Sequence, residues 1–345
     1  MASLGALKRS MALTLILIFG MLFTLLVVIS TLVQWYMEDN LFPFWFQMVF
    51  IVLLTLGFVL LQWAISPGII RWSSRLRYLR SGENPFFENT VRELCQKSGV
   101  PMPALAVSPD RSPNAFVFGR SRKSATLAVH VGLLEQLNKD EIRGVLAHEI
   151  GHIKHNDMTI MTIVSVVPIL AYMLARSVLF SGGRGRRDSG AALLVAALLG
   201  FAVYVVSQLM ILKLSRQREF YADAFSAVAT NDPHSLSSAL AKITYGLSLS
   251  KEQPGAARSF YIGDPLSAKR EIGSIMQNRS KYDLDGDGVL DEKELMLAME
   301  EEAKRRRHSE VASTHPSTFR RIQMLKEMEK DLKHGGMGKE IYGRI

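Results

Sequence analysis

Two histidines four residues apart, with a glutamate directly after the first, are the strongest chemical signal in the sequence. His148, Glu149 and His152 lie in the segment His-Glu-Ile-Gly-His. Residues four apart share one face of an α-helix, so both imidazoles can bind one metal ion. Glu149 can then reach a water molecule beside that ion. This spacing is typical of zinc hydrolases, in which the histidines bind the metal and the glutamate acts as general base.

The residues around this motif predict the helix that it requires. Asn138 can cap the helix N-terminus, and Glu141 follows three residues later, in the arrangement of a capping box. Apolar residues then recur at helical spacing, at Ile142, Val145, Leu146, Ile150 and Ile153. Because the motif by itself also arises by chance, the rest of the chain has to supply a third ligand.

Two acidic residues are placed to provide that ligand and its support. Glu219 and Asp223 are four residues apart and follow a long apolar run. On a helix they share one face, with Glu219 expected to bind the metal and Asp223 to hold the free N–H of a histidine. A solvated acidic face is the alternative interpretation. His155 is another candidate ligand, although three ligands on one straight helix do not readily form a tetrahedron.

Length and composition indicate a membrane protein rather than a nucleic-acid-binding protein. The chain has 345 residues, of which 48% are hydrophobic and 21% charged, and its net charge is +9. A high hydrophobic content and a substantial charged content occur together here because the apolar residues are concentrated in blocks. The sequence has no basic motif interleaved with aromatic residues, so the positive charge favours a membrane surface as partner. The single cysteine, Cys95, excludes an intramolecular disulfide and a cysteine-rich metal site.

Four apolar runs predict about four transmembrane helices, because each is long enough to span a bilayer. The runs cover residues 11–33, 44–65, 158–180 and 190–212. The first is too long for a signal peptide and is not followed by a cleavage-site pattern, so we interpret it as a retained anchor. For the last two runs, a pair of buried core helices is the alternative.

Basic residues predict the orientation of these helices. The second run is followed by Arg71, Arg75, Arg77 and Arg80. Because positively charged loops stay in the cytoplasm, both the N-terminus and the chain after residue 70 are expected there, with the protein in the cell (inner) membrane. Three arginines between the third and fourth runs oppose this orientation. Their loop is short, however, and the other stretches carry many more basic residues.

Short strand-like runs precede the zinc motif. They cover residues 105–107, 115–118 and 126–129 and are separated by turn residues. We therefore expect a small β-sheet next to the helix of the motif. An edge strand of such a sheet can hold an extended peptide by backbone hydrogen bonds.

A separate acidic segment, residues 283–294, matches the twelve-residue calcium loop of an EF-hand at every defining position. Gly288 allows the sharp turn. The expected Ca²⁺ ligands are Asp283, Asp285, Asp287, the Val289 carbonyl, Asp291 through water, and Glu294. Helical patterns flank the loop, over residues 265–281 and 292–307. An acidic surface turn is the alternative interpretation.

With these residues in view, the chain resembles the HtpX-type membrane-integrated zinc metalloproteases, relatives of the CaaX prenyl proteases. The resemblance covers nearly the whole chain except about residues 267–312. The matching segments are Pro-Asn-Ala-Phe at 113–116, the histidine motif continued to residue 157, Arg-Glu-Phe-Tyr-Ala-Asp at 218–223, and Thr-His-Pro at 314–316 followed by Arg321.

The resemblance implies a role for each matching residue. It assigns zinc binding to His148, His152 and Glu219, general-base catalysis to Glu149, and support of a ligand to Asp223. It also implies that Asn114, Ala115 and Phe116 lie beside the bound substrate and that His315 lies near the cleft, where it could stabilise an oxyanion. It says nothing about calcium, because the EF-hand lies where typical members have a short linker.

Together these features predict a mainly α multi-pass membrane protein with a zincin (gluzincin-type) α+β catalytic domain and an inserted EF-hand helix-loop-helix. The expected segments are 1–70 with two transmembrane helices, 71–157 with the sheet and the zinc motif, 158–212 as a transmembrane hairpin, 213–266 with the third ligand, 267–312 as the EF-hand insertion, and 313–345 with the His-Pro motif and a helix.

The expected function is zinc-dependent cleavage of membrane-associated or misfolded polypeptides, with one Zn²⁺ and one Ca²⁺ as cofactors. The role in protein quality control is implied by the resemblance, and calcium modulation of activity is a hypothesis. One alternative is a CaaX-type prenyl-peptide protease, which is disfavoured because four spans cannot enclose the large chamber of that family. The other is a calcium-responsive membrane scaffold without proteolysis.

Overall fold

The chain forms two units, and each combines segments that are distant in sequence. The first unit contains Pro67–Met158 and Ser215–Ile345, and the second contains Ala6–Ser66 and Thr159–Leu214, as far as these ranges are described. The computed structural model describes residues 9–21, 23–24, 27, 44–181, 190–249, 262, 265–288, 292–306 and 313–333.

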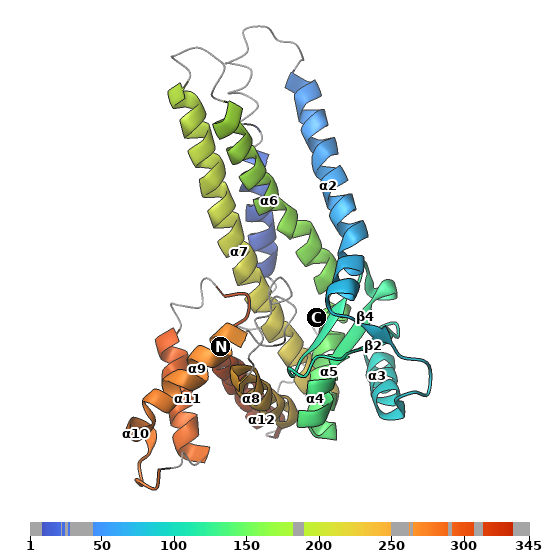
Figure 1. Cartoon of the computed structure of the whole chain (residues 1–345), viewed down its shortest axis with the longest axis vertical. Coiled ribbons are helices and arrows are strands. Elements are labelled where there is room, and N and C mark those ends of the chain that lie inside the picture. Colours follow the sequence, from blue (N-terminus) through green and yellow to red (C-terminus); the bar gives the residue numbers. More distant parts are fainter. Residues whose placement is uncertain are drawn as a thin grey trace. The chain divides into compact units, whose positions relative to one another are not determined.

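Long apolar helices make up the second unit. They are the helix over Arg9–Met21 and most of α2 (Phe44–Ser73), α6 (Asp157–Ser181) and α7 (Gly190–Thr230) (Figure 1). Side chains from all four pack together: Ile18, Val164 and Ile211 are buried in one cluster, and Val59 of α2 packs against it. The ends of α2, α6 and α7 belong to the first unit, so these helices connect the two units covalently.

Within the described residues, one helix is long and apolar enough to cross a membrane on its own, the part of α7 from Leu194 to Thr230. A second candidate arises only if α5 (Lys139–Lys154) and the first part of α6, which are bent by 60° against each other, are counted as one span. The helix over Arg9–Met21 is shorter. The rest of the first apolar run and residues 182–189 lie outside the described part, so the four spans stay a prediction.

A four-stranded sheet in the order β1-β2-β4-β3 lies in the first unit. Its strands are β1 (Arg77–Tyr78), β2 (Ala104–Ser108), β3 (Ala115–Phe118) and β4 (Thr126–His130). The central pair β2–β4 is parallel, and β1 and β3 run antiparallel to their neighbours. The three predicted strands are confirmed. β1 was not predicted, because two residues are too few to show a pattern.

Helix α5, which carries the zinc motif, begins with the predicted capping box. The Asn138 side chain accepts a hydrogen bond from the Glu141 N–H at 2.9 Å, and Glu141 accepts one from the Asn138 N–H at 2.9 Å. Two backbone donors at the helix start are thereby satisfied. The observed helix confirms the prediction from the local sequence.

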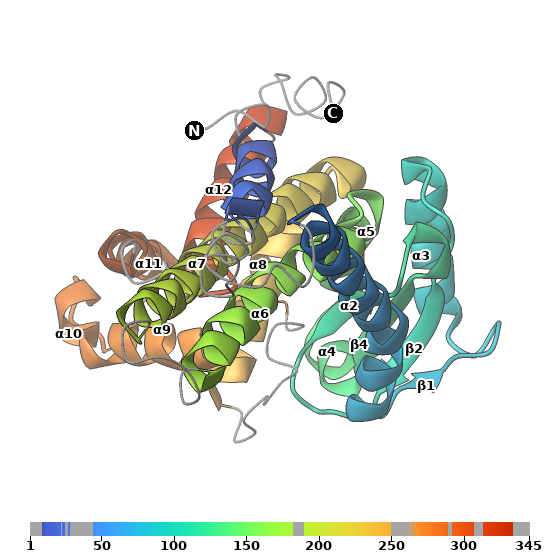
Figure 2. The same cartoon turned by 90° about the horizontal axis from the view of Figure 1, so that it is seen from above.

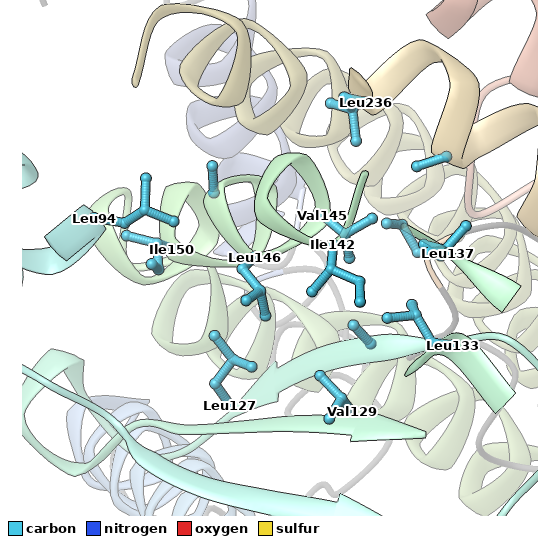
Figure 3. Packing of buried hydrophobic residues seen from close by; sticks show 14 of the residues in the cluster. Leu94, Leu127, Val129, Leu133, Leu137, Ile142, Val145, Leu146, Ile150 and Leu236 are labelled. Carbon is cyan, nitrogen blue, oxygen red and sulfur yellow. The ribbon is translucent and has the colours of Figure 1, made fainter. Parts of the chain in front are cut away.

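The apolar face of α5 packs onto the sheet. Figure 3 shows Ile142 and Leu146 of α5 facing Leu127 and Val129 of β4, in a buried cluster that also includes Leu94. These side chains are almost completely removed from water, and their burial is the main favourable term that holds the helix in place. The opposite face of α5 is therefore fixed in position relative to the sheet.

Helix α8 (Pro233–Leu249) contacts α5 as well as the C-terminal helices α9 and α12. Figures 1 and 2 both show α9, α10 and α11 grouped together, with α12 next to α8. The bounds of the others are α3 (Pro85–Ser98), the 3₁₀ turn η1 (Arg122–Ser124), α4 (Val131–Gln136), α9 (Pro265–Gln277), α10 (Arg279–Tyr282), α11 (Glu292–Arg306) and α12 (Thr318–Lys333).

Candidate metal centre

Two histidines from α5 and a glutamate from α7 come together in the first unit. The Nε2 atoms of His148 and His152 are 3.1 Å apart, and the two rings meet edge to face. Glu219 Oε2 lies 3.7 Å from His148 Nε2, and the other carboxylate oxygen, Oε1, lies 3.7 Å from His152 Nε2. The structure thus brings together the three ligands that were predicted from the sequence.

The separations between these atoms fit a shared zinc ion. Zinc lies about 2.0–2.2 Å from histidine nitrogen and carboxylate oxygen, so two ligands of one ion are at most about 4.4 Å apart. The observed separations of 3.1, 3.7 and 3.7 Å meet this condition. Two histidines and one glutamate are also a ligand set that catalytic zinc sites use.

A close approach of α5 and α7 makes this geometry possible. At Gly151, a Cβ atom would lie 3.0 Å from the Phe225 ring and 3.2 Å from the Cα of Ala222. Glycine, the residue before the second histidine, therefore lets the two helices pack almost backbone to backbone. Glu219 precedes Ala222 by about one helical turn, so the close contact carries its carboxylate to the histidines.

Each histidine is held from behind by a carboxylate. His148 Nδ1 lies 2.9 Å from Asp223 Oδ1, and His152 Nδ1 lies 2.7 Å from Asp157 Oδ2. Both Nε2 atoms are thereby left facing Glu219, as a metal ligand requires. The support from Asp223 was predicted, whereas that from Asp157 was not.

Asp157 reaches His152 because α5 ends in an abrupt turn. Asn156 adopts a left-handed conformation with φ of 57°, which asparagine tolerates better than most residues. The chain bends by 60° there, and Asp157 begins α6 next to the last turn of α5. In the sequence, the only indication of this turn is an asparagine near the expected end of the helix. It does not show that the side chain of Asp157 points toward His152.

Two buried arginines complete the site. Arg321 of α12, only 1% exposed, donates two hydrogen bonds to Asp223 at 2.7 and 2.8 Å, and its Nη1 lies 3.1 Å from Glu219 Oε2. Arg218 donates to Asp157. The sequence indicates Arg321 only through the family resemblance, and it predicts no role for either arginine.

Burial and charge set the protonation of the central groups. Burial raises the pKa of Glu149 to about 8. Burial alone would lower the pKa of His152, but its hydrogen bond to Asp157 and the surrounding carboxylates raise it to about 9. Burial lowers the pKa of His148, and the nearby His315 and Arg321 outweigh burial and hold the pKa of Glu219 well below its usual value.

The centre of the site holds more buried carboxylates than buried arginines. If all ionised, the four buried carboxylates and two buried arginines sum to minus two. The pKa values of Glu149 and His152, raised to about 8 and about 9, favour a proton on each group, and these two protons would offset the charge when no metal does so. One Zn²⁺ would replace both protons. The six charged residues are Glu149, Asp157, Glu219, Asp223, Arg218 and Arg321.

His315 and His155 occupy different positions relative to the ligands. His315 Nδ1 lies 3.5 Å from Glu219 Oε2, and within the described residues neither of its ring nitrogens makes a hydrogen bond. His155 packs edge-on against Tyr221 and Phe225, with ring centroids 5.2 and 6.1 Å apart, and is not one of the three clustered ligands.

The predicted substrate segment is connected to the site through backbone contacts. Asn114 is buried, and its Oδ1 accepts a hydrogen bond from the Ile262 N–H at 2.9 Å. The Ile262 carbonyl in turn accepts one from Arg321 at 2.5 Å. Ala115 and Phe116 are buried in β3, the edge strand.

The acidic loop forms a second group of oxygen ligands between α10 and α11. Asp283, Asp285 and Asp287 each offer an oxygen within 4.8 Å of the others. Glu294 is buried and accepts hydrogen bonds from the Leu284 and Asp285 N–H groups at 2.5 and 3.3 Å. The other two predicted ligands, Val289 and Asp291, lie outside the described residues.

Comparison with known proteins identifies several relatives. Residues 82–329 match the model of peptidase family M48. The protease HtpX homolog of Methanothermobacter thermautotrophicus is 37% identical over 243 residues, which cover 70% of this chain and 87% of that one. The protease HtpX homolog 2 of Methanosarcina acetivorans is 32% identical over 291 residues, which cover 82% of this chain and 86% of that one. Among solved structures, Ste24p of S. mikatae matches with a TM-score of 0.45 and 18% identity, over 92% of this chain and 65% of that one.

We expect Asp157→Asn to weaken zinc binding about 10- to 100-fold, because His152 loses the carboxylate that orients its ring. The affinity can be measured by competition with a chromophoric chelator. Asp140→Asn is the matched control, since it makes the same charge change at an exposed position in the first turn of α5. Equal zinc affinity of Asp157→Asn and wild type would contradict this support role.

We also expect zinc binding at pH 7 to release about two protons from chelator-treated protein. The pKa values of Glu149 and His152 lie above 7, at about 8 and about 9, so both groups carry a proton before the metal enters. Titration calorimetry in buffers of different ionisation enthalpy measures the release. Glu149→Gln should release about one proton fewer, and identical release from both proteins would rule out Glu149 as a source.

Proposed function

This chain belongs to peptidase family M48, and from that premise we propose that it is a membrane-integrated zinc endopeptidase that cleaves misfolded or membrane-associated polypeptides. Its class, a metalloprotease that acts on peptide bonds, follows from the family. The observation that supports the zinc chemistry most strongly is the meeting of His148, His152 and Glu219 around one point, with Glu149 buried beside them.

In the proposed mechanism, His148, His152 and Glu219 hold the zinc. Bound by these residues, zinc would supply Lewis acidity toward the scissile carbonyl and would lower the pKa of a water toward about 7. Glu149 takes the proton of the attacking water and then delivers it to the leaving amine. Asp157 and Asp223 keep the ligand rings oriented through their Nδ1 atoms.

The substrate is proposed to bind as an extended strand along β3. In the described sheet β3 pairs with β4 on one side only, so its other edge can pair with a peptide backbone. Such pairing would run along Asn114, Ala115 and Phe116. It recognises the peptide backbone rather than the side chains, so it suits unfolded polypeptides of varied sequence. His315, buried next to Glu219, is proposed to stabilise the oxyanion.

We propose that the four apolar runs cross the membrane and that both catalytic segments and the EF-hand lie in the cytoplasm. Large apolar side chains on α2 and α7, such as Phe50, Leu53 and Leu198, are exposed, as expected of surfaces that face lipid. With Asn40→Cys and Gly185→Cys, a membrane-impermeant thiol reagent added outside should label the protein. Ser280→Cys should stay unlabelled, and labelling of it from outside would overturn the orientation.

We further propose that the EF-hand loop binds one Ca²⁺ and that this binding modulates proteolysis. The flanking helices share a core with the helix that supports the zinc ligands: Phe319 of α12 packs with Ile275, Tyr282 and Ala298 from α9, α10 and α11. Phe319 precedes Arg321 by two residues. Ordering of the loop by calcium can therefore shift Arg321 and the segment that carries His315.

We expect Glu149→Gln to lower the rate of casein or membrane-protein cleavage by a factor of about 10² to 10⁴, because the general base is lost. Zinc content should remain that of wild type, since Glu149 is not a ligand, and self-cleavage should also stop. Zinc is measured by atomic absorption and cleavage by gel.

Retained cleavage in Glu149→Gln would refute the catalytic assignment. A prenylated peptide, tested beside the unfolded membrane protein, separates the proposal from a CaaX-type activity. Preferential cleavage of the prenylated peptide by wild type would favour that alternative.

We expect calcium to raise the thermal stability of the wild type and to change its cleavage rate, and Asp283→Ala to abolish both effects. The physical reason is the loss of the first carboxylate of the loop. Phe319→Leu is the informative partner variant, because it leaves the loop intact but alters the contact with α12. Phe319→Leu should still bind calcium, but calcium should change its cleavage rate less than that of the wild type. Unchanged calcium dependence in Asp283→Ala would refute the coupling.

A further inference from the structure

An open cavity of about 690 Å³ lies where α2 ends, and none of the proposed catalytic residues lines it. Its walls are formed by Gly68, Arg71, Trp72, Ser73, Arg75 and Leu76. All of these residues belong to the first unit. We propose that this cavity binds the headgroup of an anionic phospholipid.

The turn that shapes the cavity uses an arginine where glycine is the usual residue. The Leu76 N–H bonds to the Arg71 carbonyl and the Arg75 N–H to the Trp72 carbonyl, both at 3.3 Å. This is the Schellman pattern at a helix C-terminus, in which the residue in the position of Arg75 is left-handed and most often glycine. Arg75 adopts a φ of 49° there, a strained conformation for a residue with a side chain.

Because glycine would form this turn with less strain, the turn itself does not require arginine. Strained residues of this kind are concentrated at ligand-binding and functional positions. What arginine adds over glycine is a guanidinium group beside the cavity. Its presence is therefore better explained by a ligand than by the fold.

Both guanidinium groups of the cavity lack an acidic partner within the described residues. Arg71 lies over the ring of Tyr78, with its guanidinium carbon 5.1 Å from the ring centroid, and neither Arg71 nor Arg75 forms a salt bridge there. The neighbouring Arg77, by contrast, is paired with Glu83. Both guanidinium groups without an acidic partner line the same cavity, and each can bind phosphate oxygens in the bidentate geometry that arginine favours.

The surroundings of the cavity point to a lipid rather than to free phosphate. Trp72 is 83% exposed and follows directly on the apolar run of α2, a position in which tryptophan is enriched at membrane interfaces. In the proposed orientation this end of α2 is cytoplasmic, where basic residues next to an apolar span attract anionic lipids. Leu76, which also lines the cavity, packs with Phe116 and Phe118 of β3, so a bound headgroup would lie next to the edge strand.

The test uses the full-length protein in a neutral detergent and three soluble probes: dioctanoyl phosphatidylglycerol, dioctanoyl phosphatidylcholine and inorganic phosphate. Arg75→Gly removes the guanidinium but keeps the turn, and Arg71→Gln removes the other cation. Arg122→Gln, at an exposed position of η1, is the control for charge. Binding is measured by thermophoresis, and folding by the melting temperature without ligand.

We expect wild type and Arg122→Gln to bind phosphatidylglycerol with equal affinity, and Arg75→Gly and Arg71→Gln to bind it at least about fivefold more weakly. Arg75→Gly should melt no lower than wild type, which separates lost binding from lost folding. Phosphatidylcholine and inorganic phosphate should both bind more weakly than phosphatidylglycerol.

Equal binding of phosphatidylglycerol by all four proteins would overturn the proposal. Inorganic phosphate that binds as tightly as phosphatidylglycerol would show a phosphate site and overturn the lipid assignment. The proposal is independent of the proteolytic function, because Glu149→Gln should bind the lipid as wild type does. A failure here would therefore leave the zinc chemistry untouched.

Discussion

Burial of charge is the constraint on which the site depends. Glu149, Asp157, Glu219 and Asp223 are removed from water within one small region, and an unpaired buried ion costs several kcal/mol. Arg321 and Arg218 offset part of this cost by direct contacts with Asp223, Glu219 and Asp157. The remaining negative charge is matched by two protons or by one divalent metal. A divalent metal bound at His148, His152 and Glu219 would therefore offset the excess of buried carboxylates.

This constraint explains why distant parts of the chain converge on α5. The ligands come from α5 and α7, their supporting carboxylates from α6 and α7, and the arginines from α7 and α12. Removing any one member leaves a buried charge without its partner, so the helices stabilise one another through the site as well as through the apolar core. The helices beside the acidic loop join this arrangement because Ile275, Tyr282 and Ala298 pack with Phe319 of α12. Phe319 lies two residues before Arg321, so this core is next to the residue that contacts Asp223 and Glu219.

Local patterns predicted a large part of the fold and of the site. The capping box at Asn138, the apolar face of α5 and three of the four strands were predicted correctly, because caps, helical spacing and turn residues act over a few positions. The three clustered ligands were also named in advance, since residues four apart on a helix must share a face. The helix predicted over residues 265–281 was only partly correct, because it is interrupted at Asn278 between α9 and α10.

The sequence by itself determined which residues could bind a metal and which helix faces would carry them, because side-chain chemistry and helical period are local properties. Only the tertiary structure decided that Asp157 turns back to His152 and that Arg321, about 100 residues after Asp223, donates two hydrogen bonds to it. It also decided that Asn114 contacts the backbone of Ile262. These contacts depend on the bend between α5 and α6 and on the packing of α5, α7 and α12. No periodicity within one segment encodes which distant charge will be buried beside another.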